Sequence, residues 1–89
     1  MHNYEIIPYL QKILNKLSKK DKPTYEQVLK KIEEIISSSD VEHYKNLRHD
    51  MKDRKRAHIG PFVLAFSFIK EENKIKFLDF DHHDRIYKK

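Results

Sequence analysis

The sequence contains no cysteine and only one glycine among its 89 residues. Without cysteine, neither a disulfide nor a thiolate metal site can support the fold. A single glycine excludes the glycine-rich loop with which many nucleoside-triphosphate enzymes hold phosphate. No apolar run approaches the roughly 20 residues that a membrane-spanning helix needs, and the first residues lack the basic-then-apolar pattern of a signal peptide. We therefore expect one soluble, cytoplasmic domain without a membrane partner.

The positive charge is unevenly distributed along the chain. Residues 1–44 contain seven Lys or Arg and seven Asp or Glu, whereas residues 45–89 contain twelve and seven. The whole net charge of +5 therefore lies in the second half. A basic half of this kind favours a polyanionic partner, nucleic acid before membrane. An ordinary solvated, lysine-rich surface is the alternative that composition leaves open.

Hydrophobic periodicity predicts a short strand, two helices and then three strands. Apolar side chains recur at helical spacing after Pro8 and again after Pro23, which predicts helices over 8–18 and 23–37. The expected strands are 2–7, 54–59, 62–70 and 74–81. The fold class that follows is α+β, with an N-terminal strand and three C-terminal strands in a small, largely antiparallel sheet. The helical hairpin is expected to cover one face of this sheet.

This architecture makes two further claims about packing. The core between the hairpin and the sheet should bury Leu14, Ile32, Leu64 and Phe66. Residues 41–53, the least regular stretch, should form a basic loop with one helical turn. Tyr44 and Leu47 are expected to anchor that loop to the core.

Cations and imidazoles lie at the outer ends of the predicted strands. Side chains in a strand repeat every two residues, so Arg54, Arg56 and His58 share one face. His82 and His83 follow the last strand, where an extended backbone points them to opposite sides. One metal ion would not easily bind both, and we expect neither a metal nor a cofactor. Imidazoles beside clustered cations suit RNA cleavage by acid–base catalysis, with the cations stabilising the phosphorane.

Two short motifs lie between Leu47 and Tyr87. The first is Leu47-x-x-Asp50-x-Lys52, followed by Arg56 and by His58-Ile59-x-Pro61 before an apolar strand. The second is the ending Asp81-His82-His83-Asp84-Arg85-Ile86-Tyr87, in which a histidine is followed four residues later by an aromatic. Together they resemble the RelE superfamily of bacterial and archaeal toxin–antitoxin toxins, and most closely its YafQ-like branch. The resemblance in order and length covers nearly the whole chain, which implies a single RelE-like domain over 1–89.

The resemblance implies a ribosome-dependent mRNA endonuclease that cleaves mRNA in the ribosomal A site by attack of the RNA 2′-hydroxyl. It also implies a RelB- or DinJ-like antitoxin that binds and silences the toxin in a hetero-oligomer. The candidate catalytic residues are His58, His83 and Tyr87. The candidate RNA-binding residues are Lys45, Lys52, Arg54, Arg56, His82 and Arg85.

The sequence departs from the family pattern at four positions. Lys45 stands where the YafQ pattern has a histidine, and Phe62 where an acidic residue is expected. Val63 replaces an arginine of the central strand, and Asp81 replaces a glycine. These departures keep a second reading open, in which a RelE- or ParE-fold protein without ribonuclease activity inhibits a protein target or binds the ribosome or RNA. A third reading is a basic RNA-binding domain without chemistry.

Overall fold

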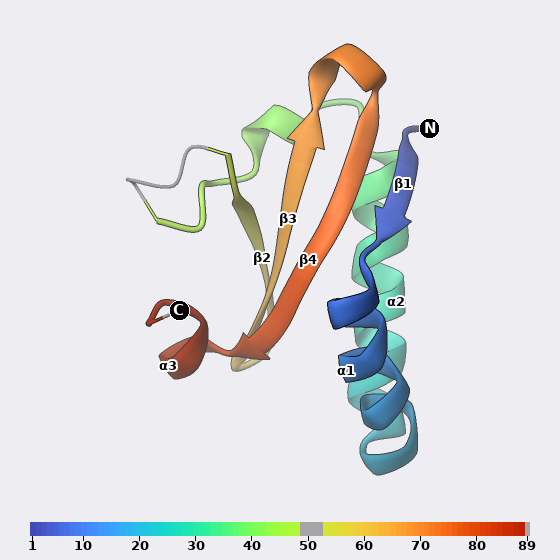
Figure 1. Ribbon diagram of the computed structural model, residues 1–89, viewed down its shortest axis with the longest axis vertical. Helices are drawn as coiled ribbons and strands as arrows, with labels where there is room; N and C mark the ends of the chain where they lie inside the picture. The colour runs from blue at the N-terminus through green and yellow to red at the C-terminus, as the bar shows by residue number, and fades with distance from the viewer. Residues whose placement is uncertain (49–52, 89) are drawn as a thin grey trace.

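The computed structural model describes residues 1–48 and 53–88. In these ranges four strands form one sheet, in the order β1-β4-β3-β2 (Figure 1). The last three strands of the chain are antiparallel to one another, and β1 runs parallel to β4. The strands are β1 (Asn3–Ile6), β2 (Lys55–Ile59), β3 (Phe62–Ile69) and β4 (Lys74–His82). The predicted fold class and all four predicted strands are confirmed.

Two helices pack together on one side of the sheet (Figure 1). α1 (Pro8–Lys20) and α2 (Lys22–Ser37) are separated by a single residue, Asp21. Each helix has a proline in its first turn, where the missing N–H group costs no hydrogen bond. The Asp21 side chain accepts hydrogen bonds from the Thr24 backbone N–H, at 3.2 Å, and from the Thr24 hydroxyl, at 2.6 Å. Asp21 therefore ends one helix and caps the next.

The main core lies between this hairpin and the sheet. Leu64 and Phe66 from β3 have no exposed surface, and Leu14 and Ile32 from the helices are 1% and 5% exposed. These four residues were the predicted core positions, and their burial confirms the prediction. Asp79 is the only buried charged residue of the described ranges, and its carboxylate accepts a hydrogen bond from the next backbone N–H.

A smaller apolar cluster lies on the opposite face of the sheet. It joins Val63 and Ala65 of β3 to Leu47 and Ile86, with Tyr87 packed against it. Ile86 belongs to α3 (His83–Ile86), a helical turn that the sequence pattern does not predict. We expected an extended segment here, and the structure shows that the backbone turns immediately after His82 instead.

The loop between α2 and β2 packs against the core through Tyr44 and Leu47, the two residues predicted to do so. It begins with a turn, η1 (Val41–His43), after which Tyr44 packs against the main core and Leu47 joins the smaller cluster. Asn46 forms a β-bridge with Lys55, which extends the sheet beyond β2 over a short distance. The Asp50 and Lys52 positions of the first sequence motif lie outside the described residues. No helix in the described ranges has the length and apolar character needed to cross a membrane.

Candidate functional site

The β2 strand presents Arg56 and His58 on the face opposite the helical hairpin. Their neighbours Ala57 and Ile59 are buried in the main core, so the alternation of the strand turns Arg56 and His58 the other way. Gly60 continues the chain with a φ of +56°, the left-handed conformation that glycine adopts without strain. The turn brings β3 back alongside β2, with Val63 opposite His58.

α3 places His83 and Tyr87 against these two side chains. The His58 and His83 rings are stacked, with centroids 6.1 Å apart and an interplanar angle of 29°. The Tyr87 ring meets His83 edge-on at 4.8 Å. Arg56 Nη1 donates a 3.0 Å hydrogen bond to the Tyr87 hydroxyl, and the guanidinium carbon lies 5.9 Å from the centre of the same ring. We call Arg56, His58, His83 and Tyr87 the β2–α3 cluster.

The position of α3 is fixed by contacts at both of its ends. The His83 backbone N–H donates a 2.9 Å hydrogen bond to the Pro61 carbonyl, beside the turn that follows β2. His82 caps the helix, because its Nδ1 accepts a 3.2 Å hydrogen bond from the Asp84 backbone N–H. Ile86 is 2% exposed and anchors the far end in the smaller apolar cluster. These contacts hold His83 and Tyr87 over β2.

The surroundings of the two clustered histidines differ. Burial lowers the pKa of His58 below its ordinary value, and the positive charges of Arg56 and of a protonated His83 lower it further. His83 has the Asp84 carboxylate at 3.6 Å from its Nδ1. The described residues contain no group of three or more His, Cys, Asp or Glu placed to hold a metal ion. Two adjacent imidazoles beside an arginine can accept and donate protons at a bound substrate, and this is the chemistry that the arrangement offers.

The remaining predicted site residues are dispersed around the cluster. The contacts of the His82 ring are with Phe62, edge-on at 5.8 Å, and with α3. The Arg85 Nε atom lies 3.5 Å from the Asp81 carboxylate. Arg54 is exposed, and its carbonyl accepts a 2.7 Å hydrogen bond from the Leu47 N–H. The structure thus brings together four of the predicted residues in the β2–α3 cluster. His82, Arg85 and Arg54 lie outside this cluster, and Lys52 lies outside the described ranges.

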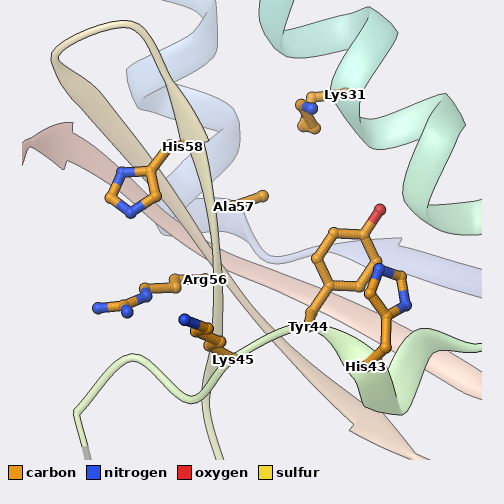
Figure 2. A pocket seen from close by; sticks show the side chains of 7 residues that line it. All are labelled: Lys31, His43, Tyr44, Lys45, Arg56, Ala57 and His58. Atoms are coloured by element: carbon orange, nitrogen blue, oxygen red, sulfur yellow. The ribbon is translucent and has the colours of Figure 1, made fainter.

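A pocket of about 360 Å³ adjoins the cluster at the outer edge of β2 (Figure 2). It includes Lys45, the remaining predicted RNA-binding residue, together with Lys31, His43 and Tyr44, for which no role in the site was predicted. Those three come from α2 and the η1 region, and only their proximity in space connects them with β2. The lining residues are Lys31, His43, Tyr44, Lys45, Arg56, Ala57 and His58.

Comparisons with known proteins agree on one family. The family described as ParE toxin of type II toxin–antitoxin system, parDE, matches residues 7–87. A protein assigned as toxin RelE4 of Methanocaldococcus jannaschii is 52% identical over 90 residues, which cover 100% of this chain and 94% of the relative.

Solved structures of RelE proteins share the fold. A chain of the intact E. coli RelBE toxin–antitoxin complex gives a TM-score of 0.76 at 20% identity, covering 96% of this chain and 100% of that one. A chain of the archaeal RelE–RelB complex from Pyrococcus horikoshii gives 0.69 at 18% identity, with coverages of 94% and 97%. The family match and the archaeal relative at 52% identity show that the chain belongs to the RelE/ParE superfamily of toxins from type II toxin–antitoxin systems.

Proposed function

We propose that this toxin is a metal-independent endoribonuclease that cleaves mRNA in the ribosomal A site. The observation that carries the proposal is the stacked pair His58 and His83, 6.1 Å apart between ring centroids, with Arg56 beside them. Two imidazoles at this separation can reach the two oxygens that exchange at one phosphorus atom. The net charge of +5 supports a polyanionic substrate.

In the proposed mechanism, His58 is the general base. Its lowered pKa keeps it neutral near physiological pH, so it can accept the proton of the RNA 2′-hydroxyl while the 2′-oxygen attacks phosphorus. The bond from phosphorus to the 5′-oxygen then breaks, and His83 donates the proton that this oxygen needs. Arg56 stabilises the phosphorane charge, and the Tyr87 hydroxyl orients Arg56. The products are a 2′,3′-cyclic phosphate upstream and a 5′-hydroxyl downstream.

The expected partner of the toxin is a RelB- or DinJ-like antitoxin in a hetero-oligomer. Support comes from the structural neighbours, which include a RelBE and a RelE–RelB complex. An acidic or amphipathic antitoxin segment would complement the basic second half of this chain. Within the superfamily we place the chain nearest the YafQ-like branch, because His58, His83 and Tyr87 match that pattern.

The decisive experiment maps mRNA ends after induced expression and repeats cleavage with the purified toxin and programmed ribosomes. Replacing His83 by alanine should slow cleavage about a hundredfold or more, since a lost general acid or base costs that much. Ribosome binding should stay near normal. His2→Gln is a matched control, because His2 contacts Asn73, just before β4 begins, whereas His83 follows the end of β4. Chelation of transition metals, with the Mg²⁺ that ribosomes require left in place, should leave cleavage intact, and full cleavage by a His58→Ala/His83→Ala double variant would refute the proposal.

A second function, inhibition of a target by binding alone, is favoured by one observation. Val63 stands where the resemblance expects an arginine, and it is fully buried in the smaller apolar cluster. Its side chain therefore contributes no charge to the site. Growth arrest without new mRNA ends carrying a 5′-hydroxyl would support this binding function over the nuclease.

A further inference from the structure

The pocket beside His58 wraps around the outer edge of β2. Figure 2 shows Arg56 and His58 on one side of the β2 ribbon, and Lys31 and Tyr44 on the other. Its lining comes from three segments that are distant in sequence: α2, the η1 region and β2. Because Arg56 and His58 belong to both the pocket and the β2–α3 cluster, the two form one continuous surface.

The described lining residues include three cations and no carboxylate. Lys45 has no ion-pair partner among the described residues, and Lys31 contacts Glu34 of its own helix at 3.1 Å. Glu34 is 59% exposed, so this surface pair is weak and an incoming anion can compete for Lys31. Burial, and after it the nearby Glu34 carboxylate, raise the pKa of the Tyr44 hydroxyl; a tyrosine is protonated at neutral pH in any case, so the hydroxyl can donate. Cations and donors without a carboxylate fit an anion such as phosphate.

An aromatic pair completes the lining. The His43 and Tyr44 rings lie 4.3 Å apart and are tilted by 35°. Tyr44 is held from behind by an edge-on contact with Phe66 at 5.5 Å. Lys55 Nζ fixes the same loop by donating to the Tyr44 carbonyl at 3.0 Å. His43 is exposed on top of this supported ring, and exposed rings of this kind are platforms on which nucleobases stack.

We propose that this pocket is a nucleotide subsite for the RNA residue next to the scissile bond. Lys31 and Lys45 lie at different parts of the pocket in Figure 2, so each holds a separate phosphate of the bound strand, and the base stacks on His43. The inference rests on the proposed ribonuclease function, since His58 connects the pocket to the reacting phosphate. The volume of about 360 Å³ is near the lower end of the roughly 300–1,000 Å³ of small-molecule sites. That size suits one nucleotide.

The first test is an NMR titration of the full 89-residue chain, labelled with ¹⁵N. The probe is a 2′-O-methyl RNA hexanucleotide, which cannot be cleaved because the attacking hydroxyl is blocked. The expected result is that the amide signals of Lys31, His43 and Lys45 shift together with those of His58 and His83. Inorganic phosphate and a DNA hexanucleotide are titrated in parallel.

Three variants then separate the phosphate contact from the base contact. Lys31→Gln should weaken hexanucleotide binding several-fold and reduce the slope of log affinity against log salt by about 0.7, as expected for one single-strand phosphate contact. His43→Ala should weaken binding several-fold with the slope unchanged. Lys30→Gln is the matched control, since Lys30 is an exposed residue of the same helix outside the pocket, and it should change neither quantity.

The pattern of shifts decides between the nucleotide subsite and its alternatives. Shifts at His58 and His83 without shifts at Lys31 and His43 would overturn the subsite and leave the proposed nuclease standing. An absence of shifts at all of these positions would overturn the subsite, whereas the nuclease is judged by cleavage on programmed ribosomes. Shifts with inorganic phosphate as large as those with RNA, and no effect of His43→Ala, would overturn the nucleotide assignment in favour of a simple anion site.

Discussion

The two histidines of the β2–α3 cluster have different neighbours, and we propose different roles for them. His58 sits on β2 beside Arg56, whereas His83 sits on α3 beside the Asp84 carboxylate. The burial and the positive neighbours of His58 favour its neutral form, which is the form that a general base requires. The residue type alone could not distinguish the two roles, because they depend on neighbours that the fold brings together.

The pH dependence of cleavage should report on His58. A base with a lowered pKa remains active at lower pH, so the acid limb of the rate profile should lie below the ordinary histidine value of about 6.5. Arg56→Gln removes a positive charge that disfavours protonation of His58, and the acid limb should then move to higher pH. Single-turnover rates measured across the pH range test this shift independently of any loss in substrate binding. An acid limb that stays in place would show that Arg56 does not influence His58.

The Tyr87 hydroxyl should act through Arg56. Tyr87→Phe keeps the ring against His83 and removes the acceptor of the 3.0 Å hydrogen bond from Arg56. A hydrogen bond of this kind contributes about 1 kcal/mol, so we expect cleavage to fall by about fivefold to tenfold. Tyr87→Ala removes the ring as well and should cost more. In an Arg56→Gln background the Tyr87→Phe change should have little further effect, and an additive loss in such a double-mutant cycle would contradict the coupling.

Among the secondary-structure elements, α3 positions His83 and Tyr87 in the site. It is also the element that the sequence pattern did not predict. Four residues are too few for helical periodicity to be recognised. Its stability comes from the local cap by His82 and from two tertiary contacts, the hydrogen bond from His83 to Pro61 and the burial of Ile86. An isolated turn of this length would not persist in water.

Loss of the Ile86 side chain should lower both the stability of the protein and the activity of the protein that remains folded. Ile86→Ala removes a side chain that is 2% exposed and should cost about 2–4 kcal/mol of unfolding free energy, as large-to-small core changes do. It should also loosen His83 and Tyr87, so cleavage should be weak even at temperatures where the protein is folded. Thermal unfolding and cleavage assays at low temperature measure both effects.

A destabilising change elsewhere serves as the control for this prediction. Asp21→Ala removes the cap of α2 and should cost about 1 kcal/mol, which corresponds to roughly 4–8 °C in Tm for a domain of this size. Because Asp21 lies at the turn between the two helices, cleavage by the folded variant should be unchanged. Normal cleavage by folded Ile86→Ala protein would show that α3 does not need this anchor.

The elements with strong periodicity were predicted well. The alternation from Arg54 to Ile59 gave the correct face for Arg56 and His58, because an edge strand with one buried face follows a period of two. The pocket could not be predicted in the same way. Lys31 on α2 and the ring pair at His43 and Tyr44 come near β2 only when the hairpin packs on the sheet. No spacing in the sequence encodes that proximity.

The sheet of this molecule has two unlike faces. The helical hairpin covers one face of the sheet and encloses the main core, while the other face carries the β2–α3 cluster. The neutral first half of the chain supplies the hairpin, and the basic second half supplies the cluster. The positive field therefore belongs to the part of the chain that is proposed to meet RNA.

Binding to ribosomes or RNA should weaken as salt rises, because each phosphate contact releases counterions. Arg54→Gln should reduce the slope of log affinity against log salt by about 0.7 if Arg54 contacts a single-stranded phosphate. Lys12→Gln changes the net charge equally on the exposed side of α1 and should leave the slope unaltered. Binding that does not respond to salt would show that the basic face is incidental.

The first strand of the chain pairs with the last. β1, at Asn3–Ile6, is hydrogen-bonded to β4, which extends to His82. During translation the N-terminal strand is made first and its neighbour in the sheet is made last. His83 and Tyr87 are later still, so a nascent chain has neither a complete sheet nor an assembled cluster. The proposed activity therefore cannot exist in a nascent chain until Tyr87 has been made and α3 has packed over β2.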